Sequence, residues 1–261
     1  MKNVSKAFII NYYGVKYKES FKTYKDKIIT SEMLKNYDCI IEPFGGSYGF
    51  SRYIYVEHRP ENMKYIIMDN DKNLIDFYIY IKDLEKEGIN EILKIYNDLL
   101  DLYDKDEYTK KGKDILKDLI EKTDNIYIKY MLKTNVKCCC FYKKTKKSMC
   151  DEFIEMLKNT TFIYNDSTDM NNITQYITPK TLIYIDPPYL SSCNTFYANV
   201  SDDYASFINK IMLYNACIFV HLQNGLLRLA YKQFNLYSED KIYMRTKKKV
   251  IHDIFTSNLI E

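Results

Sequence analysis

Apolar residues follow two different rhythms along this chain, and the first rhythm suits strands that alternate with helices. The apolar runs Cys39–Phe44 and Lys64–Met68 end in glycine or acidic residues, which predicts buried strands that enter tight turns. The segments Tyr48–Val56 and Asn73–Leu84 have helical periodicity, and Ser47 is placed to cap the first of them. This strand–helix repetition predicts a parallel sheet with covering helices.

The middle of the chain shows the second rhythm, in which no convincing strand interrupts the helical spacing. From Gly88 to Leu132, Ile, Leu and Tyr recur among Lys, Asp and Glu, and Met149–Leu157 repeats this pattern. Residues 86–158 are therefore predicted to form an inserted, mostly helical lobe.

Strand signals return after this insert. The predicted strands are apolar and rich in β-branched or aromatic residues: Thr161–Tyr164, Leu182–Ile185, Cys217–His221, Ile242–Arg245 and Ile251–Thr256. The last two are joined by a lysine-rich turn. The expected fold class is therefore α/β, with a catalytic domain formed by residues 1–85 and 159–261 and interrupted by the insert.

Composition excludes several classes of protein. The formal net charge of the 261 residues is only +3, so any affinity for nucleic acid must come from local basic patches. No apolar run approaches the roughly 20 residues of a membrane span, and Ala7–Ile10 is too short for a signal-peptide core. The 7 cysteines, three of them consecutive at 138–140, and the 3 histidines lack metal-ligand spacing. We therefore expect reduced thiols, no metal site and an intracellular protein.

The strongest chemical signal is DPPY, which follows the predicted strand Leu182–Ile185. Ligands bind outside the carboxyl ends of strands in open α/β sheets. The Asp186 carboxylate and the Pro187 carbonyl can accept hydrogen bonds from an exocyclic amine, hold it in line with a methyl donor and stabilise its developing positive charge. Tyr189 offers a flat face on which a flipped-out base can stack. The alternative is an ordinary proline turn after a strand.

A second signal combines glycines with an acid. Gly45 and Gly46 lie between a predicted strand and a predicted helix, where a ligand can approach the backbone closely. Asp69 ends the next strand, where an acid bonds ribose hydroxyls in dinucleotide-type folds, and Asp71 competes for that role. A helix-capping turn explains the glycines equally well, and a solvated helix cap explains either acid.

Two weaker signals complete the set. Asp166, in the Asn165–Ser167 turn after a predicted strand, can accept from the amino group of a bound adenine, although a capped turn explains it as well. Gly14 and Lys16 lie in a polar aromatic segment near the amino terminus, where a solvated lysine is the ordinary interpretation.

Taken in chain order, the segments NYYGVK, EPFGGSYGF, IIMDNDKNLI, the insert, FIYNDS and IDPPYL resemble the Dam-like family of adenine-specific DNA methyltransferases. The resemblance implies a Rossmann-like class I methyltransferase fold, with a seven-stranded, mostly parallel sheet whose last strands form an antiparallel hairpin. It also implies methyl transfer from S-adenosylmethionine to the exocyclic N6 amine of adenine in duplex DNA, with residues 86–158 as the target-recognition domain. The family's amino-terminal Trp is replaced by Tyr12 and Tyr13.

The resemblance also implies which residues form the site. The expected catalytic residues are Asp186, Pro187, Tyr189 and Lys16. The expected cofactor-binding residues are Tyr12, Gly14, Lys16, Glu42, Pro43, Phe44, Gly45, Gly46, Asp69, Asn70, Asp166, Ser167 and Asp186. Glu42, Phe44 and Gly46 match the loop around the methionine end of the cofactor, whereas Asp69 matches the ribose-binding acid.

The insert also contains a basic segment that suits DNA. Lys143, Lys144, Lys146 and Lys147 follow Phe141 and Tyr142, so lysines could contact phosphates while an aromatic side chain fills the space of a flipped base. A solvated lysine-rich turn is the alternative, and Lys241–Lys249 is a rival basic patch.

Other functions remain open at this point. The alternatives are an RNA adenine methyltransferase and a catalytically inactive DNA-binding module of the same fold; a protein-glutamine methyltransferase usually has Asn in place of Asp186. A partner restriction nuclease is a further possibility. The insert lacks the hairpin pattern expected of enzymes that read GATC, which leaves the recognition sequence open.

Overall fold

The computed structural model describes residues 29–102, 110–138, 151–165, 169–186, 207, 210–211, 213–214, 216–222, 235–243 and 248–256. These residues fall into two compact units. The described residues between Asn73 and Asn159 form a helical unit, and those within 29–72 and 160–256 form a sheet unit.

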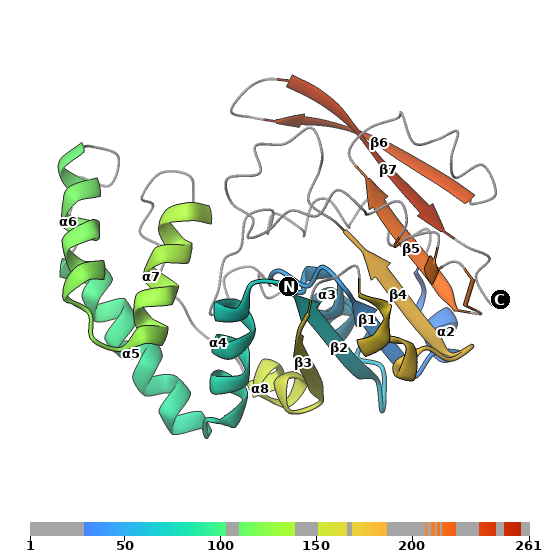
Figure 1. Ribbon diagram of the computed structural model, residues 1–261, viewed down its shortest axis with the longest axis horizontal. Coiled ribbons are helices and arrows are strands. Elements are labelled where there is room, and N and C mark those ends of the chain that lie inside the picture. The colour runs from blue at the N-terminus through green and yellow to red at the C-terminus, as the bar shows by residue number, and fades with distance from the viewer. Residues whose placement is uncertain are drawn as a thin grey trace. The chain divides into compact units, whose positions relative to one another are not determined.

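The sheet unit is built on a seven-stranded sheet with the order β3-β2-β1-β4-β5-β7-β6 (Figure 1). Its strands are β1 (Cys39–Glu42), β2 (Lys64–Asp69), β3 (Thr160–Tyr164), β4 (Thr181–Ile185), β5 (Cys217–Leu222), β6 (Asn235–Tyr243) and β7 (Lys248–Thr256). The neighbours from β3 to β5 are all parallel, whereas β7 is antiparallel to both β5 and β6. The α/β fold with a parallel sheet that we predicted from the sequence is confirmed.

The strand order reverses between β1 and β4. Strand β1 pairs with β2 on one side and with β4 on the other, so that Ile41 lies opposite both Ile66 and Ile183. All residues of β1 and β4 are buried, which is typical of central strands covered on both faces. Because the chain leaves these two strands toward opposite edges of the sheet, their carboxyl ends mark the position at which open α/β sheets form a ligand crevice.

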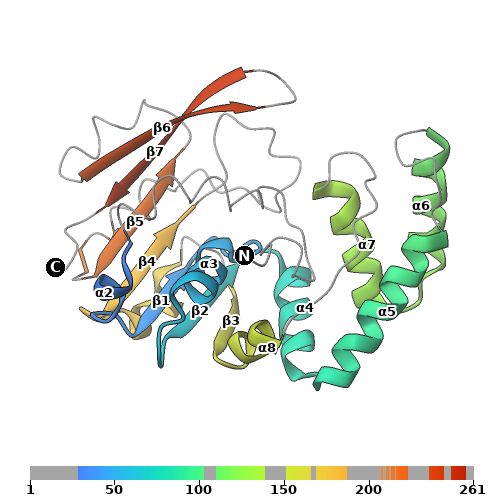
Figure 2. The same ribbon diagram turned by 180° about the vertical axis from the view of Figure 1, so that it is seen from behind.

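Both faces of the sheet are covered. On one face, Phe50 of helix α3 (Gly49–His58) stacks on Tyr184 of β4, with ring centroids 4.3 Å apart. On the other face, alternate strand residues such as Ile41 and Ile183 form a core with Phe207 and other apolar side chains. Helix α2 (Ser31–Leu34) lies on the same face as α3 (Figures 1 and 2), and two short 3-10 turns, η1 (Met170–Asn172) and η2 (Thr174–Tyr176), precede β4.

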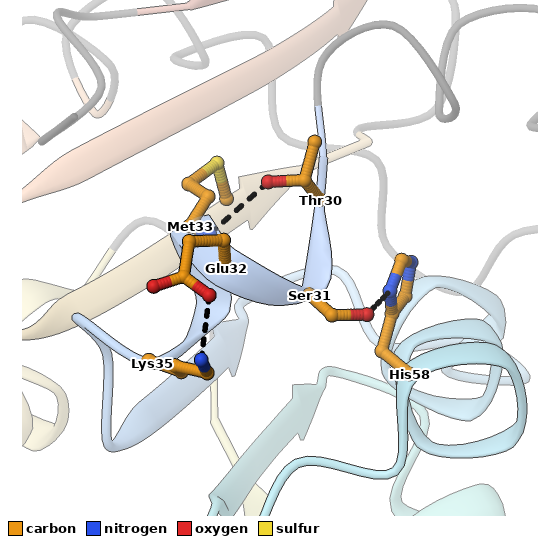
Figure 3. Close-up of polar contacts among 6 residues, drawn as sticks. All are labelled: Thr30, Ser31, Glu32, Met33, Lys35 and His58. Carbon is orange, nitrogen blue, oxygen red and sulfur yellow. Dashed lines mark hydrogen bonds and ion pairs between the residues drawn. The ribbon is translucent and has the colours of Figure 1, made fainter.

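A hydrogen bond joins α2 to the last residue of α3, at the end of α3 away from the carboxyl ends of the strands (Figure 3). The Oγ1 atom of Thr30 accepts from the backbone N–H of Met33 at 3.1 Å and so caps α2. The Oγ atom of Ser31 lies 3.0 Å from Nδ1 of His58, the last residue of α3. Figure 3 also shows the ion pair between Glu32 and Lys35 on the exposed face of α2.

The helical unit contains five helices among its described residues. They are α4 (Lys72–Asp83), α5 (Lys86–Leu102), α6 (Lys110–Lys122), α7 (Ile126–Cys138) and α8 (Asp151–Lys158). Helix α7 packs against both α5 and α6. Tyr80 of α4 stacks on Tyr127 of α7 with ring centroids 3.7 Å apart, and Phe77 of α4 contacts Tyr130 of α7. In the part of the chain that the structure describes, no helix is both long and apolar enough to span a bilayer.

Two details of the sequence prediction were wrong. Ser47 does not cap α3, because the N-cap residue is Tyr48 and it makes no side-chain capping bond. The sixth strand is Asn235–Tyr243 and not Ile242–Arg245, since a polar run in its middle hides the strand pattern. Arg245 itself lies outside the described residues.

Candidate active site

The candidate site lies in the sheet unit, where β1, β2 and β4 end side by side. Three segments meet there: the glycine loop after β1, Asp69 as the last residue of β2, and Asp186 directly after β4. This end of the sheet lies at the reversal of strand order, which is where open α/β sheets usually bind their ligands.

The glycine loop runs close along β2. The N–H of Gly45 donates to the carbonyl oxygen of Met68 at 2.6 Å. A Cβ atom on Gly45 would lie 2.5 Å from Cγ2 of Ile67 and 2.8 Å from that same carbonyl oxygen, so only glycine fits. Gly46 has φ 48°, in the left-handed region that glycine adopts readily. Glycine is therefore required at the two positions for different reasons. At position 45 the backbone packs too closely against β2 for a side chain, and at position 46 the backbone conformation favours glycine.

The carboxylate of Asp69 holds this loop by a hydrogen bond. Its Oδ2 atom accepts from the N–H of Gly46 at 2.8 Å, and its Oδ1 atom accepts from the N–H of Asp71 at 2.9 Å. Burial raises the pKa of the Asp69 carboxyl to about 6, although the backbone N–H groups of Asp71 and Gly46 lower it. Each oxygen accepts one of these bonds and keeps a further lone pair for a ligand hydroxyl.

Glu42 is a buried acid at the start of the loop. Its side chain is 2% exposed, and Oε1 accepts from the N–H of Ser51 at 2.6 Å. Because Ser51 lies in the first turn of α3, the Glu42 carboxylate accepts from an N–H that has no partner within the helix. Glu42 therefore caps α3 from β1, in place of the N-cap residue Tyr48, whose side chain makes no capping bond. Desolvation raises the pKa of Glu42 to about 7; Ser51 and Arg52 lower it, and the charge of Asp186 raises it.

Asp186 is half-buried and immediately follows β4. Its charge acts on the pKa of Glu42, so the carboxylates at the ends of the neighbouring strands β1 and β4 are electrostatically coupled. Pro187 and Tyr189, the other predicted catalytic residues of this loop, lie outside the described residues.

The remaining cofactor-site predictions are covered only in part. The N–H of Asn165 donates to the carbonyl oxygen of Asp69 at 3.1 Å, and its side-chain amide donates to the carbonyl of Asp169 at 3.0 Å. The chain that leads to Asp166 is thus bonded to the end of β2. Asn70 directly follows Asp69, and its backbone lowers the pKa of that acid.

Several predicted residues lie outside the described part of the chain. These are Tyr12, Gly14, Lys16, Asp166, Ser167, Lys143, Lys144, Lys146 and Lys147. In the described ranges, no group of three or more His, Cys, Asp or Glu side chains could hold a metal ion.

Sequence reasoning missed the residues beneath the glycine loop. Ser51 and Arg52 are 0% and 1% exposed, and Phe207 packs edge-on against Phe44 with ring centroids 5.6 Å apart. A polar Ser-Arg pair within the otherwise apolar run Gly49–Val56 is a weak signal, and nothing in the sequence links Phe207 to Phe44.

The fold and the site together define an α/β protein whose ligand site lies at the strand-order reversal and holds a glycine loop with an acid at the end of β2. The model of the D12 class N6 adenine-specific DNA methyltransferases matches residues 22–245 of this chain. The chain belongs to this family, and its reaction is the methylation of adenine at N6 in DNA. The match begins after Tyr12, Gly14 and Lys16.

One solved structure similar to this chain is an rRNA methylase from Streptococcus thermophilus. The two are 9% identical, the alignment covers 87% of this chain and 92% of that one, and the TM-score is 0.37. No curated protein sequence matches the chain.

Proposed function

We propose that this crevice binds S-adenosylmethionine and that Asp186 receives the target adenine beside it. The observation that carries this proposal is the junction of the Gly45–Gly46 loop with Asp69, next to Asp186, where β1, β2 and β4 end. We propose a Rossmann-like class I methyltransferase fold, which the strand order and the antiparallel pairing of β7 support.

The residues around Asp69 fit the cofactor. A carboxylate that already accepts from Gly46 and Asp71 still has acceptor capacity for two ribose hydroxyls. Asn70 continues this ribose end of the site. Asp166 and Ser167, which follow the bonded Asn165, lie beside the cofactor adenine in this proposal.

The loop after β1 would hold the other end of the cofactor. Glu42, Pro43, Phe44, Gly45 and Gly46 surround its methionine part, and the buried Glu42 carboxylate lies at the base of this loop. The bound cofactor supplies an electrophilic methyl group on a cationic sulfonium. Tyr12, Gly14 and Lys16 complete the site near cofactor and target base, as the resemblance implies.

Asp186 has the central catalytic role in this proposal. The exocyclic nitrogen of adenine is a poor nucleophile because its lone pair is delocalised into the ring. The Asp186 carboxylate and the Pro187 carbonyl accept hydrogen bonds from the two N–H groups of this nitrogen. These bonds orient its lone pair toward the methyl donor and stabilise the positive charge that develops on it. Tyr189 stacks on the flipped base. The half-buried position of Asp186 at the crevice supports this role.

Residues 86–158 are proposed as the target-recognition domain. The compact helical unit of described residues between Asn73 and Asn159 supports a separate role for this part of the chain, although its boundary falls earlier than residue 86. Lys143, Lys144, Lys146 and Lys147 would contact DNA phosphates. A partner restriction nuclease is also proposed, because the substrate is DNA. An intracellular location is proposed because Cys39 is a free, buried thiol.

The proposal is tested with methyl-labelled S-adenosylmethionine. We expect duplex DNA to take up label, while RNA and protein do not, and we expect the label on adenine N6. Sequencing the methylated sites of a random duplex pool then gives the recognition sequence. Label in RNA alone would favour the RNA methyltransferase, and DNA binding without label in any substrate would favour the inactive module.

The lysine cluster needs a separate test. Changing Lys143, Lys144, Lys146 and Lys147 to Ala should weaken DNA binding regardless of sequence and reduce the salt dependence by about one unit of slope for each lysine–phosphate interaction that is removed. Cofactor affinity should stay unchanged. Identical slopes for wild type and variant would transfer the role to Lys241–Lys249.

A further inference from the structure

Arg52 is a buried cation for which the reaction described above provides no role. It lies in the first turn of α3, and its side chain is 1% exposed. A guanidinium stays charged at any ordinary pH, and burying a charge is unfavourable unless partners compensate it. Its partners therefore indicate what the charge is used for.

Those partners lie at both ends of the glycine loop. Nη2 of Arg52 donates to Oγ of Ser47 at 3.3 Å, and the guanidinium carbon lies 5.7 Å from the ring centroid of Tyr48. The charge of Arg52 also stabilises the ionised form of Glu42, the last residue of β1. One side chain thus acts where the loop leaves β1 and where it enters α3.

The loop needs such support at Tyr48. This residue has φ 38° and ψ 51°, a left-handed conformation that is unfavourable for a residue with a bulky side chain. Its ring is fully buried, with the Arg52 guanidinium near it and with Phe162 edge-on at 5.7 Å. A strained residue persists only where its surroundings hold it, and Arg52 is part of those surroundings.

We propose that Arg52 is a positioning residue for the methyltransferase site: it holds the Pro43–Tyr48 loop in its cofactor-binding conformation and balances the buried charge of Glu42. This inference rests on the proposed cofactor role of that loop. Arg52 touches neither cofactor nor base in it, and acts through Ser47, Tyr48 and Glu42.

The proposal predicts a specific dependence on pH. Among the described residues, the charged groups that act on Glu42 are Arg52 from the first turn of α3 and Asp186 after β4, and Glu42 in turn acts on the hydroxyl of Tyr48. With Arg52 present the pKa of Glu42 is about 7. Without Arg52 this pKa rises further, so Glu42 is protonated over a wider pH range and the loop loses its carboxylate near neutral pH.

The experiment compares full-length variants. Arg52→Met removes the charge, Arg52→Lys keeps it, and Arg52→Met combined with Glu42→Gln removes both charges. Arg59→Met is the matched control, because it removes the same charge at the other end of α3. Calorimetric titration with S-adenosylmethionine and urea unfolding of the cofactor-free protein are measured from pH 5.5 to 8.5, and circular dichroism checks the fold.

We expect Arg52→Met to weaken cofactor binding on the order of tenfold at pH 7 and to shift the pH profile upward, because losing a charged interaction has effects of this size. Arg52→Lys should keep the wild-type pH profile, and Arg59→Met should match wild type throughout. At pH 8.5 the double variant should be more stable than Arg52→Met alone, because a buried Glu42 carboxyl without Arg52 must either ionise unpaired or bind a proton at that pH, whereas glutamine does neither.

Two results would overturn the proposal. The first is wild-type affinity and pH profile in Arg52→Met; the second is a double variant that is no more stable than Arg52→Met at pH 8.5, or that fails to fold. A wild-type protein that does not bind S-adenosylmethionine would instead contradict the proposed function, and the unfolding measurements on cofactor-free protein would still test the Arg52–Glu42 pair.

Discussion

The two units of this molecule bury different kinds of side chain. Among the described residues, both buried charged side chains, Glu42 and Arg52, lie in the sheet unit beside the candidate site. The helical unit is held by aliphatic residues and by aromatic contacts such as the stack of Tyr80 on Tyr127. In the described part of the helical unit the buried polar residue is Thr123, whose hydroxyl donates to the carbonyl of Leu119 at the end of α6.

This difference separates two ways of using the interior. Apolar packing stabilises a helical unit with little dependence on any single polar partner, and volume-conserving changes are tolerated there. Buried charges contribute little net stability, but they fix the position of groups that must act together. The site is therefore the part of the molecule where small changes should have the largest effects, and the following substitutions test this contrast.

The largest effect should follow from Asp186→Ala. Losing an acceptor that acts mainly in the transition state should reduce methyl transfer on the order of 10²-fold or more, while the fold and much of the cofactor affinity remain. Single-turnover rates with labelled cofactor and duplex DNA measure this loss. Asp38→Ala, which removes an acid before β1 at the opposite end of the sheet, should keep full activity. Near-normal turnover in Asp186→Ala would disprove the assignment of this loop.

Asp69→Ala should mainly affect cofactor affinity. Two ribose hydroxyls would lose an ionised acceptor, and a charged hydrogen bond contributes about 1.5 to 3 kcal/mol, so roughly ten- to hundredfold weaker binding is expected. Calorimetric titration decides between Asp69 and its neighbour, since Asp71→Ala should bind nearly as well as wild type. The reverse pattern would assign the ribose to Asp71.

The buried acids should also make stability depend on pH in an unusual direction. The pKa of Glu42 rises from 4.5 to about 7 on folding, mainly through desolvation, so the folded state binds more protons between these values. The free energy of unfolding should therefore fall as pH rises from about 4.5 to 7, by an amount on the order of 1 to 3 kcal/mol. Urea unfolding over this window measures the decline.

Glu42→Gln should remove about half of that decline. Asp69 contributes in the same direction, because burial raises its pKa from 3.8 to about 6. A wild-type stability that instead increases steadily across this window would show that neither acid carries the raised pKa.

A pair of glycine substitutions gives the smallest and most direct comparison of the two units. Gly45→Ala should lower the unfolding free energy by roughly 1 to 3 kcal/mol, because the new Cβ collides with β2 at Ile67 and at the backbone of Met68. Gly88→Ala in α5 should raise it by about 0.5 to 1 kcal/mol, since alanine favours helix and the new Cβ meets only the flexible Leu84 side chain, at 3.3 Å.

Denaturation midpoints of these two variants and wild type provide the measurement. Equal effects at the two positions would mean that the glycine loop is not packed tightly against β2. This result would contradict the expectation that small changes have larger effects in the site than in the helical unit.

The sequence predicted the elements better than the contacts between them. Buried runs such as Ile40–Ile41 and Leu182–Ile185 show their strands directly, because a strand covered on both faces is apolar throughout. Strand β6 was misplaced because Ser238, Glu239 and Asp240 interrupt its apolar residues. A strand paired on one side only has less need of the apolar pattern on which the prediction relies.

The site shows the same division. DPPY, the two glycines and Asp69 could be found because their chemistry appears in adjacent letters or at a known spacing from a strand end. The hydrogen bond that the Gly46 N–H donates to Asp69 and the capping of α3 by Glu42 could not be found, since their partners lie 23 and 9 residues apart in the chain and meet only in the folded structure. The expected cap at Ser47 failed for this reason: the N-terminus of α3 is satisfied from β1.

The pairing of β1 with β4 also has a consequence for synthesis of the chain. Ile41 lies opposite Ile183, so about 140 residues must leave the ribosome before this central pair can form. Over that interval β1 and β2 can pair with each other, while the backbone groups on the other edge of each strand still lack their partners in β4 and β3. The helices between them have mostly local contacts and can form early, which shortens the effective distance that the closing sheet must bridge. Slow translation or loss of the insert's structure should therefore show first as misfolding of the sheet.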